Sequence, residues 1–400
     1  MSRIDELVAE LCPNGVEWRE IGTVLDYEQP TKYLVSSKDY SDDFATPVLT
    51  AGKTFILGYT SETDGIYPAS AENPVIIFDD FTTDFKWVDF PFKAKSSGMK
   101  MLTAADENLA TIRYAYYAMQ MISFSPLDHK RHWISEYSHF EIPVPPIEVQ
   151  REIVRILDSF AELEAELEAE LGARKAQYAY YRDRLLSLES LEALDGKPVE
   201  MKRLDEVFDL KNGYTPSKKK AEYWENGEVN WFRMEDIRAN GNVLNDSIQK
   251  VSIDGIKGGK LFEANSLIVA TSATIGEHAL VTVPFMCNQR FTCLTRKPAY
   301  RNSLDMKFVS HYASKLDEYC LENTNQGGFA SVSMPAFKSF PIPVPSLATQ
   351  QKVVDILDRF DALTTSLTDG LPAEIEARKA QYAYYRDRLL DFPRKEVAAS

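Results

Sequence analysis

The chain has 400 residues, of which 44 % are hydrophobic and 26 % charged, a composition typical of a globular protein of two or three domains. Its net charge of −15 argues against a simple stand-alone nucleic-acid binder, because such proteins use lysine and arginine to displace phosphate counterions. No apolar run approaches the roughly 20 residues that span a bilayer, no secretory signal is predicted, and the four cysteines suggest no disulfide framework, so we expect a cytoplasmic protein without membrane contact.

The predicted elements form two similar halves, each with a mixed body followed by a long helix. The expected segments are an N-terminal helix (1–15), a first body (16–145), a first helix (146–198), a second body (199–345) and a second helix (346–400). Within the bodies, Val75–Phe78 and Ser266–Val269 predict buried strands, and Tyr114–Met121 and Lys307–Lys315 predict helices. Each body is therefore expected to be an α/β domain.

An internal repeat dominates the chain. The string ARKAQYAYYRDRLL occupies Ala173–Leu186 and recurs unchanged as Ala377–Leu390. Weaker matches precede it, where Ile142-Pro143-Val144-Pro145 corresponds to Ile342-Pro343-Val344-Pro345. The bodies themselves share little sequence, so we predict two variable domains flanked by matching helices. Recent gene conversion could also produce the identical strings.

Both long helices carry an apolar stripe. Leu157, Phe160, Leu163, Leu167 and Leu171 recur at spacings of three and four, and Leu357, Phe360, Leu363, Leu367 and Leu371 repeat the pattern. The stripes predict that the two helices pack as a coiled coil, although two separate helices, each covering its own body, remain an alternative. Pro372 is expected to kink the second helix.

Signatures of catalytic chemistry are absent from the sequence. Ala51–Thr54 resembles the end of a phosphate-binding loop, but Pro47 stands where that motif needs glycine. Asp79, Asp80 and Asp84 resemble an acidic nuclease site, but their spacing favours a solvated cluster at a strand edge. His129 and His132 have no third metal ligand nearby and favour a basic loop. We expect no bound cofactor, no metal site and no catalytic residues.

The chain as a whole resembles the DNA specificity subunits of type I restriction–modification systems. The resemblance rests on the two-half layout, the Ile-Pro-Val-Pro segments, the repeated ARKAQYAYYRDRLL string, Tyr27–Tyr33, and Asn212–Lys218 followed by Tyr223-Trp224-Glu225. It implies two target recognition domains with mixed sheets, separated by two long helices in an antiparallel coiled coil with pseudo-twofold symmetry. The subunit would be non-catalytic and would bind double-stranded DNA.

The resemblance also implies the partners. Two methyltransferase subunits would dock on the chain, and two motor–nuclease subunits would join the full complex. Adenine methylation with S-adenosylmethionine and ATP-dependent cleavage with magnesium would then be carried out by these partners. The alternatives are a coiled-coil scaffold that does not bind DNA and a self-contained methyltransferase or nuclease.

Candidate DNA-binding residues are polar or basic groups beside turns and strand ends, where they can reach phosphates or base edges. In the first body they are Gln29, Thr31, Lys32, Lys53, Lys93, Lys95, Ser96, Ser97, Lys130 and Arg131. In the second body they are Tyr214, Thr215, Ser217, Lys218, Lys219, Lys220, Ser272, Thr274, Asn288, Gln289 and Arg290. For each one, an ordinary solvated loop residue is the alternative.

The repeated string is the candidate docking surface, because its polar residues recur together with its apolar stripe. The candidate partner-binding residues are Arg174, Lys175, Gln177, Arg182 and Arg184 in the first copy and Arg378, Lys379, Gln381, Arg386 and Arg388 in the second.

Overall fold

The computed structural model describes residues 3–52, 54–128, 130–325, 330–365 and 370–395. The chain divides into two compact units, which we call unit 1 (Met1–Glu166 and Ile375–Ser400) and unit 2 (Leu167–Glu374). Each unit therefore combines one of the expected bodies with helical segments from both halves of the sequence repeat.

Unit 1 contains a four-stranded sheet and a three-stranded sheet. Its strands are β1 (Glu17–Glu20), β2 (Leu25–Glu28), β3 (Thr46–Leu49), β4 (Ile56–Thr60), β5 (Val75–Asp79), β6 (Phe85–Val88), β7 (Lys93–Ala94), β8 (Met99–Ala104) and β9 (Glu141–Val144). The larger sheet is antiparallel, in the order β2-β8-β5-β6. In the smaller sheet, β3 is antiparallel to β4 and parallel to β7. The short helices are α1 (Arg3–Leu11), α2 (Ile21–Val24) and α3 (Ile112–Met119).

Unit 2 repeats this plan. Its strands are β10 (Glu200–Arg203), β11 (Phe208–Asn212), β12 (Val229–Phe232), β13 (Val243–Leu244), β14 (Lys250–Val251), β15 (Ser266–Ala270), β16 (His278–Val281), β17 (Met286–Cys287), β18 (Phe291–Arg296), β19 (Thr324–Asn325), β20 (Ser331–Val332) and β21 (Pro341–Val344). The larger sheet has the order β11-β18-β15-β16-β13, and the smaller has β14-β12-β17, with β12 parallel to β17. The shorter helices are α6 (Leu204–Val207), α7 (Met234–Asn240), α8 (Met306–Glu322) and α9 (Met334–Ser339).

The strand that contains each Pro-Val-Pro segment pairs with the first strand of its domain. β1 pairs with β9 from Glu17↔Val144 to Glu20↔Glu141, and β10 pairs with β21 from Glu200↔Val344 to Arg203↔Pro341. The two antiparallel ribbons have the same register. They join the start of each domain to the strand that immediately precedes the next helix.

The central strand of each larger sheet is buried on both faces, which explains its uninterrupted apolar sequence. In β5, Ile76 and Phe78 belong to one buried cluster, while Val75 and Ile77 belong to another. β15 is divided in the same way between two clusters. Both predicted strands are therefore confirmed. The two predicted helices are also confirmed as α3 and α8, of which α8 extends further than expected.

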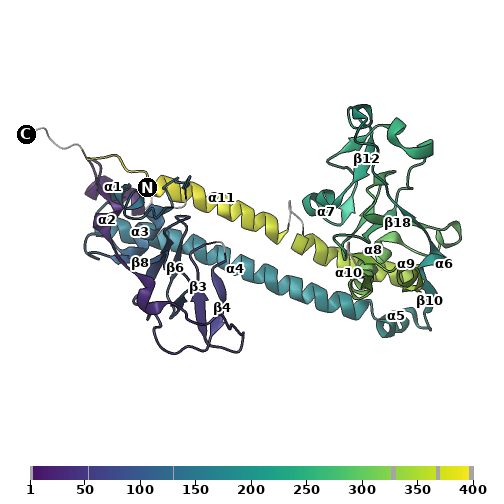
Figure 1. Cartoon of the computed structure of the whole chain (residues 1–400), viewed down its shortest axis with the longest axis horizontal. Helices are drawn as coiled ribbons and strands as arrows, with labels where there is room; N and C mark the ends of the chain where they lie inside the picture. Colours follow the sequence, from purple (N-terminus) through teal and green to yellow (C-terminus); the bar gives the residue numbers. More distant parts are fainter. Residues whose placement is uncertain (1–2, 53, 129, 326–329, 366–369, 396–400) are drawn as a thin grey trace, which may run out of the picture. The chain divides into compact units, whose positions relative to one another are not determined.

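The long helices begin after the proline segments. α4 (Ile147–Leu185) is one helix of 39 residues that contributes to both units, and Figure 1 shows it without interruption. The short α5 (Leu188–Asp195) follows it, and the second half of the chain has α10 (Leu347–Thr365) and α11 (Leu371–Leu390). Pro372 lies in the first turn of α11, where its missing N–H has no helical acceptor in any case, so it does not kink the interior of one long helix.

Helices from different halves of the chain pack together inside each unit. In unit 1, the Phe160 ring stacks on Tyr385 at 5.3 Å, and Lys379 Nζ lies 3.7 Å from Glu164 Oε1, so α4 and α11 are antiparallel there. In unit 2, the Tyr181 ring stacks on Phe360 at 5.8 Å. The predicted antiparallel coiled coil is confirmed, and each repeated string packs against the helix of the other half.

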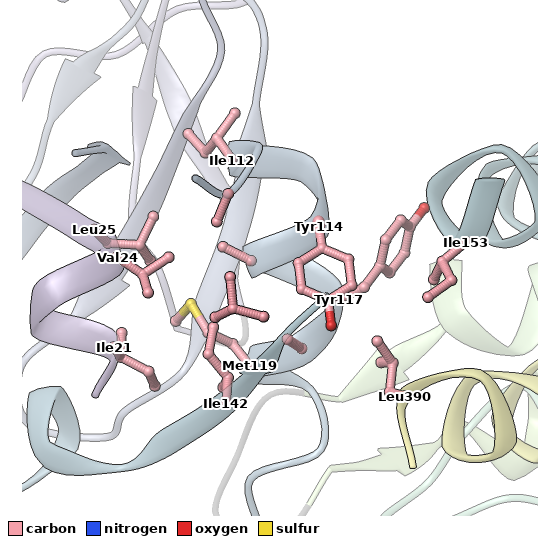
Figure 2. Close-up of a cluster of buried hydrophobic side chains, with 14 of the residues drawn as sticks. Ile21, Val24, Leu25, Ile112, Tyr114, Tyr117, Met119, Ile142, Ile153 and Leu390 are labelled. Atoms are coloured by element: carbon pink, nitrogen blue, oxygen red, sulfur yellow. The ribbon is translucent and has the colours of Figure 1, made fainter. Parts of the chain in front are cut away.

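The end of α11 completes the core of unit 1. Figure 2 shows Leu390 beside Tyr117 and Ile153, and Leu390 is buried in the same apolar cluster as these two side chains. The last turn of the second repeated string is thus part of the first domain's core.

Candidate nucleic-acid interface and partner surface

In unit 2, two parallel strands bring two sets of polar residues to one edge of the smaller sheet. β12 and β17 pair as Trp231↔Met286 and Phe232↔Cys287. Because parallel strands run in the same direction, Arg233 and Asn288, the next residues of each strand, lie together. The Asn288 N–H donates to the Phe232 carbonyl at 3.1 Å. We call this the β12–β17 edge, and the predicted residues Asn288, Gln289 and Arg290 lie on it.

The loop that carries Tyr214 to Lys220 reaches the same edge. The Tyr214 N–H donates to the Cys287 carbonyl at 2.9 Å, and the Thr215 hydroxyl donates to Gln289 Oε1. Gly213 permits this close approach, since a Cβ there would lie 2.2 Å from the Cys287 carbonyl oxygen. The structure therefore brings together two predicted groups that are separated by about 70 residues of chain.

Most of the cations in this loop remain available. Lys218 and Lys219 are exposed and have no ion pair among the described residues, while Lys220 Nζ donates to the Tyr223 hydroxyl at 2.9 Å. Ser217 is exposed, whereas the hydroxyl of Tyr214 is used internally, donating to the Gly255 carbonyl at 3.1 Å.

The loop with Ser272 and Thr274 starts at this edge as well. The Thr271 N–H donates to the Arg290 carbonyl at 2.9 Å, and Ser272 forms an isolated bridge with Ser331. Both Ser272 and Thr274 are half-buried.

Unit 1 has the equivalent arrangement. β3 and β7 pair as Val48↔Lys93 and Leu49↔Ala94, so Thr50 occupies the place of Arg233 and Lys95 the place of Asn288. We call this the β3–β7 edge. The predicted residues Lys95, Ser96 and Ser97 follow β7 there, and Lys95 Nζ donates to the Tyr40 hydroxyl at 2.9 Å.

The remaining described candidates of unit 1, apart from Lys93, are exposed. Gln29, Thr31 and Lys32 are exposed at a short 3-10 helix (Pro30–Tyr33), after which the Val35 N–H donates to the Ala94 carbonyl at 3.0 Å. Lys32 pairs with Glu28 at 3.3 Å. Lys130 and Arg131 are exposed, and Lys130 pairs with Asp128 at 2.6 Å. Lys53 and His129 lie outside the described residues.

Lys93 does not fit a DNA-contacting role. Its side chain is buried, and Nζ lies 2.7 Å from Glu62 Oε2 and 2.7 Å from the Asp64 carbonyl oxygen. The hydrogen bond from Lys93, with those from the backbone N–H groups of Ser37 and Ser36, holds the pKa of Glu62 below its ordinary value. The charge of Lys93 is thus matched inside the domain.

The expected solvated acidic cluster is wrong for Asp80. Its carboxylate is buried, Oδ2 pairs with Lys100 Nζ at 3.0 Å, and Oδ1 accepts from the Trp133 N–H at 2.8 Å. His132 is likewise buried and not part of an exposed basic loop. Burial lowers the pKa of His132, but its hydrogen bonds with the Asp128 carbonyl and the Glu136 carboxylate outweigh this and raise the pKa above its ordinary value.

Within the described ranges, no group of three or more His, Cys, Asp or Glu side chains is placed to hold a metal ion. All four cysteines are free and buried. Among the helices in the described part of the chain, none is both long enough and apolar enough to span a bilayer.

The two repeated strings have the same local structure. Arg174 and Arg378 each donate to a glutamine three residues later at 3.0 Å, and Arg182 and Arg386 each donate to the following aspartate at 2.9 Å. Arg184 and Arg388 are exposed, whereas Arg182 is partly covered and lines a cavity of unit 2 with Tyr178 and His311. Arg184 is therefore better placed than Arg182 to contact a partner.

The sequence patterns did not identify several residues that lie at these surfaces. Tyr180 and Tyr384 are 59 % and 61 % exposed in the repeated strings. Arg233 lies on the β12–β17 edge, and the signal that identified Asn288, a polar residue directly after a buried strand, would also have found it.

Comparison with known proteins places these features in a family. Residues 13–173 and 196–377 match the family described as the type I restriction modification DNA specificity domain. The chain is 46 % identical to the type I restriction enzyme EcoR124I/EcoR124II specificity subunit of Escherichia coli, with 100 % of both chains covered. It is 54 % identical to the EcoprrI specificity subunit of Escherichia coli, over 52 % of this chain and 54 % of that protein.

A solved structure has the same fold. The S subunit of a type I restriction–modification system from M. genitalium matches with a TM-score of 0.56 and 17 % identity, covering 94 % of this chain and 96 % of that one.

Proposed function

Because this chain belongs to the family of type I restriction–modification DNA specificity subunits, we propose that it reads a bipartite DNA target, one half-site with each unit, and docks two methyltransferase subunits. Subunits of this family are non-catalytic, and the chemical steps belong to partner subunits. The proposed domain boundaries are 1–15, 16–145, 146–198, 199–345 and 346–400.

One observation carries the two-reader proposal. In unit 2, candidate residues from segments about 70 residues apart meet at the end of the parallel strand pair β12–β17, and in unit 1 the candidates Lys95, Ser96 and Ser97 follow the equivalent parallel pair β3–β7. The side chains at these two edges differ, with Lys95-Ser96-Ser97 in one and Asn288-Gln289-Arg290 in the other. Equivalent positions with different polar groups suit two domains that read different base sequences.

The repeated strings support the docking of two copies of one partner. Each presents an exposed tyrosine and an exposed arginine, residue types that dominate the binding energy of protein interfaces. The methyltransferase subunits would also supply cations that this chain, with its net charge of −15, lacks. Two motor–nuclease subunits would complete the restriction complex.

Exchange of one domain tests the two-reader proposal. Residues 16–140 are replaced by the corresponding segment of another specificity subunit, and the sites methylated by the complex with methyltransferase are mapped by sequencing. One half of the recognised sequence should change and the other half should remain. A change in both halves, or in neither, would contradict the assignment of one half-site to each unit.

A further inference from the structure

The β12–β17 edge of unit 2 is hollowed into a pocket of about 640 Å³. The pocket is lined by two indole rings and by several polar groups. We call it the tryptophan pocket and define it by Lys218, Trp224, Trp231, Arg233, Gln289 and Arg290. The acidic side chains of Glu225 and Glu235 also line it, so this set has three cations and two anions.

The indole walls are held by the surrounding backbone. Trp231 Nε1 donates to the Tyr214 carbonyl at 3.0 Å, and Trp224 Nε1 donates to the Ser217 carbonyl at 3.2 Å. The two rings are nearly perpendicular, with centroids 4.9 Å apart and an interplanar angle of 86°. Because the rings do not face each other, they form a rigid corner and not a slot into which a single extruded base could stack.

Arg233 is fixed in this corner through its backbone. Its N–H donates to Asp236 Oδ2 at 2.6 Å, and Asp236 Oδ1 accepts from the Ile248 N–H at 2.7 Å. The Asp236 carboxylate is fully buried, so both of its oxygens are used to hold two segments of backbone. Asp236 is thus a positioning residue for Arg233.

The side chain of Arg233 makes few interactions within the described part of the chain. Its guanidinium carbon lies 5.6 Å from the Trp231 ring centroid, and Nε lies 3.8 Å from a carboxylate oxygen of Glu235. Nε is buried and has no hydrogen-bond partner among the described residues. A buried donor without a partner carries a desolvation cost, and the Arg233 side chain as a whole is 30 % exposed where it lines the pocket.

From this geometry, and resting on the proposed function, we propose that Arg233 is a specificity-determining residue that contacts a guanine in the half-site read by unit 2. A guanidinium can donate two hydrogen bonds to guanine O6 and N7, a pattern that no other base offers in the major groove. Gln289, beside it, has the amide chemistry that suits a neighbouring adenine. Lys218 and Arg290 would contact the adjoining phosphates.

The equivalent position in unit 1 differs. Thr50 stands in place of Arg233, and its hydroxyl donates to the Thr54 carbonyl at 2.5 Å. The arginine contact is therefore assigned to one half-site only.

The substitution Arg233→Gln tests the assignment, because glutamine pairs with adenine where arginine pairs with guanine. The variant is assembled with methyltransferase, and its methylated sites are mapped across a genome. Discrimination for guanine at one position of the unit 2 half-site should fall by about tenfold or more, with adenine newly accepted there. The half-site read by unit 1 should be unchanged.

Two further variants keep the test decisive. Arg233→Lys retains the charge but loses the planar pair of donors, so it should also relax the same guanine position. Arg238→Gln removes an exposed arginine of α7, the short helix that begins directly after Arg233. Arg238 Nη2 lies 3.7 Å from Glu277 Oε1, outside the pocket, so this variant should leave both half-sites unchanged.

Unaltered discrimination in both Arg233 variants would overturn the proposal. The proposal would also be overturned if the half-site that unit 2 of the unmodified protein recognises contained no G·C pair. Exchange of residues 199–340 separates this outcome from failure of the two-reader function. If the exchange alters one half-site while the Arg233 variants do not, only the assignment of Arg233 is wrong.

Discussion

Lys100 and Asp80 form an ion pair inside unit 1, and their side chains are only 2 % and 1 % exposed. The Lys100 ammonium also lies 4.7 Å from the centroid of the Tyr27 ring. Removal of one partner from such a pair leaves the other charge buried and unpaired, which costs much more than loss of a surface pair. The pair joins β8 to the turn after β5 and is an internal structural link of unit 1.

The substitution Lys100→Met should therefore destabilise unit 1. We expect the free energy of unfolding to fall by about 3–5 kcal/mol, because Asp80 would remain without its cation. Urea denaturation followed by tryptophan fluorescence measures the change. Lys130→Met is the matched control, since Lys130 is 78 % exposed in its pair with Asp128, and its cost should stay below about 1 kcal/mol. Equal effects of the two substitutions would show that burial of the pair is unimportant.

At the scale of elements, the repeated strings combine an inner and an outer surface. On the inner surface, Tyr181 and Tyr385 stack on Phe360 and Phe160 of the other helix, although each ring remains partly exposed. Packing requires only this inner surface to recur, yet the exposed residues are identical as well. Arg184 Nη1 donates to the Tyr180 hydroxyl at 3.3 Å, so the outer surface of the first string has a defined tyrosine–arginine pair.

Charge reversal on this outer surface should remove one partner at a time. With Arg184→Glu, we expect native mass spectrometry to detect one bound methyltransferase in place of two, because a central interface arginine can contribute 2 kcal/mol or more. Arg388→Glu should remove the other copy. Arg151→Glu reverses an exposed charge on α4 outside the repeated string and should leave two copies bound. Retention of both methyltransferases in Arg184→Glu would argue against docking at the strings.

At the scale of the whole molecule, the connection between the units includes one uninterrupted helix. α4 contains the tetrads Ala161–Glu164 and Ala165–Glu168, and the boundary between the two compact units falls within the second of them. A helix rises about 1.5 Å per residue, so one tetrad adds about 6 Å. If the helices set the separation of the two half-sites, their length should determine the number of unread base pairs between them.

Deletion of Ala165–Glu168 should shorten the unread spacer by roughly one to two base pairs, since base pairs rise about 3.4 Å. Both half-sites should stay the same, because no domain residue is altered. Deletion of only two residues is the control, since it rotates the following stripe by about 200° and should reduce methylation at every site. The methylated sites of both variants are mapped by sequencing, and an unaltered spacer in the tetrad deletion would refute the role of helix length.

Much of the candidate DNA interface could be predicted from the sequence. The sequence did not show which of the predicted residues are exposed and able to contact DNA. Asn288, Gln289 and Arg290 were recognisable because polar residues directly followed a buried strand. Lys93 satisfied a similar rule, yet its charge is matched by Glu62, a partner 31 residues earlier in the chain. Sequence spacing does not show such a partner, because the fold of distant segments decides which side chains meet.

The two-half architecture, the buried strands and the helical stripes could all be predicted from the sequence, because repeats and hydrophobic periodicity are local properties of the chain. The residue pairs that meet between the two long helices, such as Tyr385 on Phe160, followed only from the three-dimensional structure. It also placed Arg233 beside Gln289 and buried Asp80 against Lys100. These arrangements depend on contacts between distant segments, which form only when the sheets and helices have assembled.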